Sequence, residues 1–137
     1  MEAKTVYIGM TADVIHHGLI NIIEIARTYG DVTIGLLTDE AIVTFKRLPV
    51  LNYEQRKRIL SNIQGVKHIV PQDEWDYTPN IKKYKPDFMI HGDDWCSGIQ
   101  ARYRQLAIDA INQYGGELIE IPYTQNISSS QLVQDAN

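Results

Sequence analysis

The chain alternates short apolar runs with longer segments in which apolar residues recur every three or four positions. The short runs are rich in β-branched residues and bounded by polar or glycine positions, a pattern typical of buried strands. They predict five strands, at residues 5–10, 31–38, 66–71, 87–94 (running into a turn) and 117–122.

The helical spacing is clearest in three segments, at residues 18–30, 52–63 and 98–116. Gly30 and Gly115 provide C-terminal stops for the first and third of these helices, and Asn52 is placed to cap the second. Weaker patterns predict a short helix or turn at 39–46, a loop with at most one helical turn at 72–86, and the start of a last helix at 127–137.

Strands that alternate with helices predict an α/β fold. We expect a single domain, residues 1–137, with an open, mostly parallel five-stranded sheet and helices on both faces. In such sheets ligands bind beyond the carboxyl ends of the strands. Candidate chemistry is therefore sought in the segments that follow strands, at residues 10–18, 38–47, 91–95 and 123–130.

Composition narrows the functional class. The 137 residues are 44% hydrophobic and 22% charged, with a net charge of −4, which fits a globular domain without the basic face of a nucleic-acid-binding protein. No apolar segment is long enough to span a membrane, and the N-terminus lacks the layout of a signal peptide. The one cysteine, Cys96, excludes an intrachain disulfide and favours a reducing compartment. We therefore expect a cytoplasmic protein.

Two adjacent histidines, His16 and His17, stand with Gly18 where the first helix is expected to begin. Free backbone N–H groups and the helix dipole make such an end an anion site, and a histidine there can donate a hydrogen bond to phosphate. For this motif alone, a helix cap or a surface position is the simpler interpretation. A zinc site is not expected, because no group of cysteines and histidines has suitable spacing.

Five cations follow the second strand: Lys46, Arg47, Arg56, Lys57 and Arg58. In an acidic chain this cluster could neutralise a polyphosphate. A solvated helix face is the better interpretation of the pattern taken alone.

The fourth strand ends in His-Gly-Asp-Asp, which brings two carboxylates to the ligand edge. They could hold a magnesium ion or bind ligand hydroxyls and amines. A tight turn in which Gly92 adopts a positive φ is an equally good interpretation. The serines of residues 128–130 could likewise cap a helix or bind phosphate.

Four ordered motifs together give the chain a resemblance to the cytidylyltransferase family, whose members are small nucleotidyltransferases with a Rossmann-like sheet. They are "TADVIHHGL" with His16 and Gly18, "YEQRK" with Arg56, "GDDW" at Gly92 to Trp95, and "ISSS" at 127–130. A narrower set, "GLLTDEAI", "KRLPVLNYEQRK", "KPDFMIHGDDW" and "GGELIEIPYT", looks like the cytidylyltransferase domain attached to phosphoenolpyruvate phosphomutase in phosphonate biosynthesis.

The resemblance implies transfer of CMP from CTP to a small phosphonate, such as 2-hydroxyethyl- or 2-aminoethylphosphonate, with release of pyrophosphate. It implies that His16 and Lys46 are catalytic, that Arg56 and Trp95 bind the acceptor or a phosphate, and that Mg²⁺ bridges the phosphates of CTP. The nucleotide-binding residues would be Met10, Thr11, Ala12, Gly18, Gly92, Asp93, Asp94, Ile127, Ser128 and Ser129. A homodimer is possible, as is often found in the family.

The chain departs from the family's H-x-G-H motif at its last position, where Leu19 replaces the second histidine. Asn126 likewise replaces the glycine before I-S-S, and Gln125 a nearby basic residue. Removing one preorganised donor of this type costs about 10²–10³ in rate. His17 is not expected to substitute, because adjacent helical positions do not share a face.

Two alternatives therefore stay open. One is a CTP-binding domain with reduced or lost catalysis, and the other is a cytidylyltransferase acting on a polyol or choline phosphate. Whether the chain is a domain of a longer mutase fusion is also left open.

Overall fold

The computed structural model describes residues 3–122 of the chain, so the predicted site residues Ile127, Ser128 and Ser129 lie outside the described part. Strands and helices alternate in the order β1 Thr5–Met10, α1 His17–Arg27, β2 Asp31–Leu37, α2 Asp39–Ile42, α3 Tyr53–Leu60, β3 Val66–Gln72, α4 Thr78–Tyr84, β4 Phe88–Gly92, α5 Gln100–Asn112 and β5 Glu117–Ile121.

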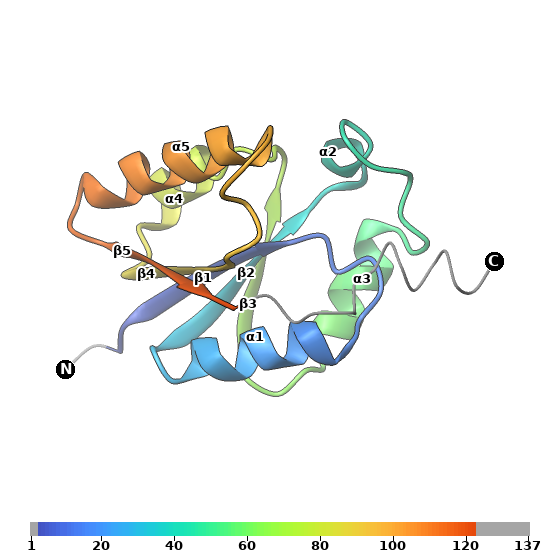
Figure 1. Ribbon diagram of the computed structural model, residues 1–137. Coiled ribbons are helices and arrows are strands. Elements are labelled where there is room, and N and C mark those ends of the chain that lie inside the picture. Colours follow the sequence, from blue (N-terminus) through green and yellow to red (C-terminus); the bar gives the residue numbers. More distant parts are fainter. Residues whose placement is uncertain (1–2, 123–137) are drawn as a thin grey trace.

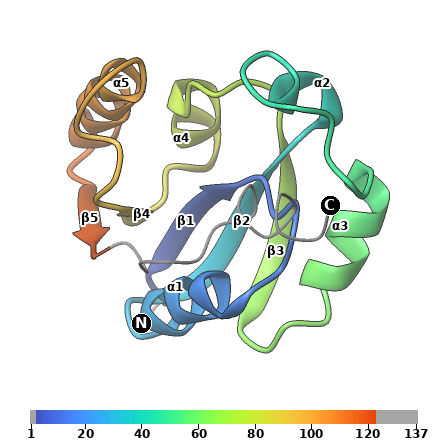
Figure 2. The same cartoon turned by 45° about the vertical axis from the view of Figure 1, so that its right-hand side comes forward.

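The five strands form one sheet in the order β3-β2-β1-β4-β5, and every pairing is parallel. Figure 2 shows this order across the sheet. The chain first builds outward from β1 to β3 and then returns to β4 on the other side of β1. The strand order therefore reverses between β1 and β4, and such a switch point is where an open α/β sheet binds ligands. The predicted fold is confirmed.

The two faces of the sheet carry separate cores because side chains alternate along each strand. On β1, Val6 and Ile8 join a buried cluster with α1 and α3, whereas Tyr7 between them joins a second cluster with α4 and α5. Figure 1 shows α1 and α3 on one side of the sheet and α4 and α5 on the other.

The helix boundaries follow local signals. Asn52 caps α3 as expected, and its side chain and that of Gln55 form a reciprocal capping box. In the segment 72–86, α4 is longer than the one helical turn predicted, because Pro79 stands in its first turn, where a missing N–H costs nothing. Ile81 anchors that helix in the core, and Lys85 ends it in the left-handed conformation.

Candidate active site

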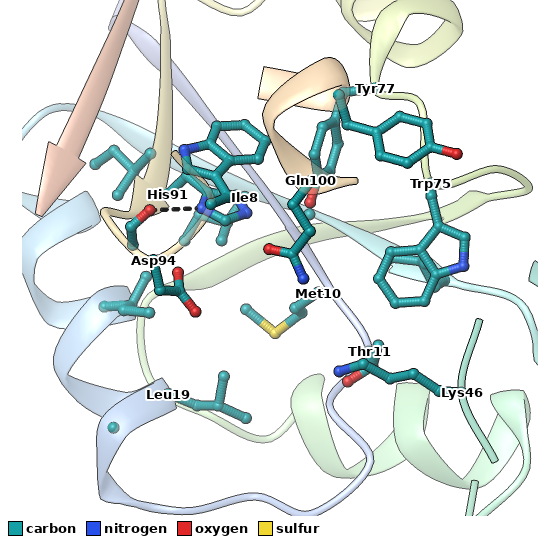
Figure 3. Close-up of a pocket in the computed structure, with 18 of the residues that line it drawn as sticks. Ile8, Met10, Thr11, Leu19, Lys46, Trp75, Tyr77, His91, Asp94 and Gln100 are labelled. Carbon is teal, nitrogen blue, oxygen red and sulfur yellow. Dashed lines mark hydrogen bonds between the residues drawn. The ribbon is translucent and has the colours of Figure 1, made fainter. Parts of the chain in front are cut away.

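A cavity of about 220 Å³ opens at the switch point between β1 and β4. Its walls come from the ends of these strands, the first turn of α1, the start of α5 and the loops after β2 and β3. Eight of the predicted site residues line it, namely Met10, Thr11, His16, Gly18, Lys46, Gly92, Asp94 and Trp95. Figure 3 shows how side chains from these separate segments converge on one space.

His16 both caps α1 and lines the cavity. Its Nδ1 accepts the backbone N–H of Gly18 at 3.1 Å, so the proton of the neutral imidazole stands on Nε2. Burial, and then the charge of His17, lower the pKa of His16, which keeps the ring in this neutral form near pH 7. The capping interpretation and the ligand-binding interpretation are therefore compatible. One nitrogen holds the helix start, and the other is a hydrogen-bond donor.

Leu19 lies three residues after His16 and also lines the cavity (Figure 3). It is half-buried and packs against the core cluster that includes α1. His17, by contrast, is exposed and is not part of the cavity wall. The first turn of α1 thus presents one imidazole and one apolar side chain to the cavity, and His17 does not take the place of the missing histidine.

Lys46 reaches the cavity from the loop after α2, against a wall of aromatic rings. Its ammonium lies 5.7 Å from the centroid of the Trp75 ring, and no ion pair holds it among residues 3–122. Trp75 is itself fixed, because its indole N–H donates to the Ala41 carbonyl at 2.6 Å. Phe45 makes edge contacts with both Trp75 and Tyr103. Lys46 is therefore a positive charge on the cavity wall whose ammonium protons are available to a ligand.

Arg56 does not reach the cavity, and this corrects its expected role in binding an acceptor or phosphate. Its side chain is 0% exposed. The guanidinium donates to three backbone carbonyls, of Thr11 at 2.6 Å, Leu37 at 2.8 Å and Leu51 at 3.1 Å, and pairs with Asp39 at 2.6 Å. Through these contacts Arg56 ties the loop after β1, the end of β2 and the start of α2 to α3.

The loop after β1 is held in shape by groups behind the cavity. Ala12 is buried and adopts the left-handed region with φ of 49°, a conformation that costs a non-glycine residue about 1–3 kcal/mol. Asp13 accepts the backbone N–H of Val50 at 2.8 Å and pairs with Arg47. Ala12 was expected to touch the nucleotide, but it lies outside the cavity wall and shapes the loop that Thr11 presents.

The cluster of five cations is not a single surface. Lys46 lines the cavity, Arg47 pairs with Asp13 and Arg56 is buried, whereas Lys57 and Arg58 are exposed on α3. The interpretation as a solvated helix face holds for the last two only.

The Gly-Asp-Asp-Trp segment combines a turn with a binding wall. The backbone N–H of Asp93 donates to the Ile121 carbonyl at 2.9 Å, which closes the turn against β5, and the exposed Asp93 is not among the cavity residues. Gly92, Asp94 and Trp95 do line the cavity. The segment thus closes a turn and also lines the cavity. The positive φ expected at Gly92 is wrong, because Gly92 is the last residue of β4 and is not among the glycines with positive φ.

Five cavity residues with aromatic or polar side chains were not among the predicted site residues, namely Trp75, Tyr77, His91, Gln100 and Tyr103. Trp75 and Tyr77 follow β3, so the rule applied to the other strand ends would have found them. Gly9 makes room for the Tyr77 ring, with which a Cβ at that position would collide. Gln100 and Tyr103 open α5, where no sequence signal separates a cavity residue from an ordinary helix residue.

No group of three or more histidine, cysteine, aspartate or glutamate side chains within residues 3–122 could hold a metal ion. Asp94 is the one carboxylate among the cavity residues described. Magnesium commonly keeps several waters and binds through one or two carboxylates together with substrate phosphates. The site therefore fits a magnesium ion carried by a nucleotide rather than one held in a protein cage.

Comparison with known proteins establishes the family. The sequence model named cytidylyltransferase-like matches residues 7–135. The chain belongs to the cytidylyltransferase-like family. The predicted enzyme class, a cytidylyltransferase, is thereby confirmed, whereas the phosphonate-specific branch is not shown.

Individual relatives agree. Over 127 residues the chain is 32% identical to glycerol-3-phosphate cytidylyltransferase of Bacillus spizizenii, with 91% of each chain covered. Over 123 residues, 88% of this chain, it is 30% identical to ethanolamine-phosphate cytidylyltransferase of Mus musculus, of which it spans 30%.

A solved structure, of the lipopolysaccharide core biosynthesis protein from Thermoplasma volcanium GSS1, superposes with a TM-score of 0.76 at 18% identity. The superposition covers 90% of this chain and 100% of the Thermoplasma volcanium chain, and it supports the fold alone. No helix within residues 3–122 is long and apolar enough to cross a membrane.

Proposed function

We propose that this cytidylyltransferase transfers CMP from CTP to a small phosphonate, such as 2-hydroxyethyl- or 2-aminoethylphosphonate, and releases pyrophosphate. The observation that carries the proposal is the pairing of the His16 Nε2 donor with the start of α1, both at a cavity on the switch point of the sheet. A helix start with a neutral imidazole donor suits a phosphate group that gains charge during reaction.

The proposed reaction is an in-line displacement at the α-phosphorus of CTP. An acceptor oxygen forms the new P–O bond while the bond from the α-phosphorus to the oxygen bridging to the β-phosphate breaks, and that oxygen leaves with pyrophosphate. The nucleophile is already an anion, so little proton transfer is required. Positioning and charge stabilisation then supply most of the catalysis, as in phosphoryl transfer generally.

Different cavity residues would contribute to positioning and to charge stabilisation. His16 Nε2 would donate to an oxygen of the α-phosphate, and the Lys46 ammonium would pair with phosphate or acceptor oxygens. Asp94, which lines the cavity, would help to hold a magnesium ion that arrives with the nucleotide. When bound, magnesium would neutralise phosphate charge.

The acceptor is the finer part of the proposal. Four sequence segments favour a phosphonate, as described above. The names of the relatives, glycerol-3-phosphate and ethanolamine-phosphate cytidylyltransferase, favour an alcohol phosphate about as well. A small phosphate ester is therefore the second candidate.

The test is turnover with a panel of acceptors. The protein is incubated with CTP, Mg²⁺ and, separately, 2-hydroxyethylphosphonate, 2-aminoethylphosphonate, glycerol 3-phosphate, ethanolamine phosphate and choline phosphate. Pyrophosphate release is measured, and ³¹P NMR identifies the product. We expect the highest kcat/KM with a phosphonate. A higher value with a phosphate ester would contradict the phosphonate assignment.

Leu19 supports a rival hypothesis of weak or lost catalysis, because it leaves the cavity one donor short. If calorimetry detects CTP binding but no acceptor in the panel leads to pyrophosphate release, that hypothesis is favoured and the catalytic one is contradicted.

A further inference from the structure

Trp95 is a buried cavity residue whose orientation is fixed by β5. Its side chain is 2% exposed, and its indole N–H donates to Glu120 Oε2 at 2.8 Å. In the unfolded chain, water accepts a hydrogen bond from the indole N–H. Once the indole is buried, a protein acceptor must replace that water, because an unsatisfied buried donor destabilises the fold. Glu120 provides that acceptor from a strand whose own residues are not among those lining the cavity.

Glu120 is in turn held by α5. Arg104 donates to Oε2 from Nε at 3.0 Å and to Oε1 from its terminal nitrogen at 2.7 Å, a two-point contact that fixes the plane of the carboxylate. The hydrogen bond from Arg104 also lowers the pKa of Glu120, so the group is a carboxylate at neutral pH.

The ring of Trp95, fixed in this way, contacts two other rings of the cavity wall. It stacks on His91, with ring centroids 3.5 Å apart and planes 5° from parallel, and Tyr77 packs edge-on against both rings. His91 is fixed further by the contact between its Nδ1 and the Gly92 carbonyl at 2.7 Å, which is drawn in Figure 3. All three rings belong to the cavity wall at the β4 side.

We propose that Glu120 is a positioning residue for the nucleotide: held by Arg104, it orients Trp95 and, through the stacked ring of His91, sets the β4-side wall of the cavity. The inference rests on the proposed function, because the ligand of that wall is taken to be CTP. Glu120 itself does not line the cavity, so it acts through Trp95.

Four variants separate positioning from a general effect on folding. Glu120→Ala removes the acceptor, and Glu120→Gln keeps an oxygen for the indole N–H. Trp95→Phe keeps a stacking ring but removes the donor, and Glu120→Ala is also combined with Trp95→Phe. The matched control is Lys67→Ala, which breaks the exposed Lys67–Asp31 ion pair between the early residues of β3 and β2.

The primary measurement is the Kd of CTP by calorimetry, with the indole N–H signals in a ¹⁵N spectrum as the structural signature. The chain has two tryptophans, so Trp75→Phe assigns the signal of Trp95. We expect Glu120→Ala to raise the Kd about tenfold and to shift the Trp95 signal, because a misplaced wall loses contacts with the ligand. Glu120→Gln should stay within about threefold and Lys67→Ala should match wild type, since both keep the contact between residue 120 and Trp95.

The double variant, Glu120→Ala with Trp95→Phe, tests whether Glu120 affects CTP binding through Trp95. If Glu120 acts through Trp95, the Kd of the double variant should equal that of the weaker-binding single variant, because each removes the same contact. Multiplying effects, or a wild-type Kd in Glu120→Ala, would overturn the inference. Because the readout is CTP binding, a failure of turnover would count against the proposed function and not against this result.

Discussion

Lys46 and Arg56 were both expected to meet phosphate, and they lie in opposite surroundings. Arg56, on α3, is buried and spends its guanidinium on three carbonyls and the carboxylate of Asp39. Lys46, on the loop after α2, lies on the cavity wall with its ammonium 5.7 Å from the centroid of the Trp75 ring and in no ion pair within the described residues.

The difference separates two uses of a cation near a ligand site. A charge whose hydrogen bonds are all made within the protein stabilises the loops that form the site. A charge that keeps free donors can bind a ligand, at little cost to folding when it is removed. The cavity depends on both kinds, because Thr11, whose carbonyl Arg56 binds, is itself a cavity residue.

The largest effect that would sharpen this comparison is on stability. Arg56→Met should lower the free energy of unfolding by about 3–5 kcal/mol, because it leaves Asp39 and buried carbonyls without their partner. Urea denaturation measures this value. Lys57→Met, one position along the same helix and exposed, should change it by less than about 0.5 kcal/mol. A loss below about 1 kcal/mol for Arg56→Met would mean that water satisfies these groups.

Arg56 also shows what the sequence could and could not predict. The apolar runs predicted the five strands because a buried parallel strand needs little beyond local composition. The "YEQRK" motif identified Arg56 but not the direction of its side chain. A signal was present, since Arg56 lies between Tyr53 and Leu60 at helical spacing, on the stripe of α3 that faces the core.

The site was predicted where local sequence and topology agree, and missed where contacts are long-range. His16 and Gly18 follow from a helix start after a strand, a feature visible in a few residues. The Trp95–Glu120 contact joins residues 25 apart on different elements, and no local pattern specifies it. Likewise, Gln100 and Tyr103 enter the cavity only because of the way α5 packs on the sheet.

The second prediction concerns Lys46. Lys46→Met should reduce kcat/KM about 100-fold, because it removes one preorganised positive group from the cavity. Its free energy of unfolding should stay within about 0.5 kcal/mol of wild type, since no ion pair within residues 3–122 is broken. Steady-state kinetics and urea denaturation test the two halves. Unchanged kinetics would remove Lys46 from the catalytic residues.

A smaller effect, and a gain, is expected at Leu19. Leu19→His would add a second donor three residues after His16 on the cavity face, and turnover should rise about tenfold. Some stability should be lost, because Leu19 packs against the core. Asn21→His adds the same side chain at an exposed position of α1 and should leave turnover unchanged. No gain from Leu19→His would show that this cavity stabilises the phosphate by another arrangement.

The smallest expected effect is the pH dependence of stability that arises from His16. This side chain combines the two roles of the cations, because one of its ring nitrogens bonds within the protein and the other is available to a ligand. His16 spends Nδ1 on the Gly18 N–H, and burial, followed by the charge of His17, lowers its pKa. A histidine of the unfolded chain has a pKa of about 6.5. Because the pKa of His16 is lower in the folded state, the unfolded state binds more protons than the folded state as the pH falls from about 7 to 5. Stability therefore rises with pH in this window and falls on acidification.

His16→Asn should remove part of that fall, because the asparagine oxygen still caps α1 but does not titrate. At pH 7 its free energy of unfolding should match wild type to within about 0.5 kcal/mol. His17→Asn, on the exposed neighbour, should retain the fall. Urea denaturation at pH 7 and pH 5 gives the comparison. A His16→Asn variant as acid-sensitive as wild type would assign the fall to other groups, first among them His91, whose pKa burial lowers against the opposing effects of the Gly92 carbonyl, Asp94 and Glu120.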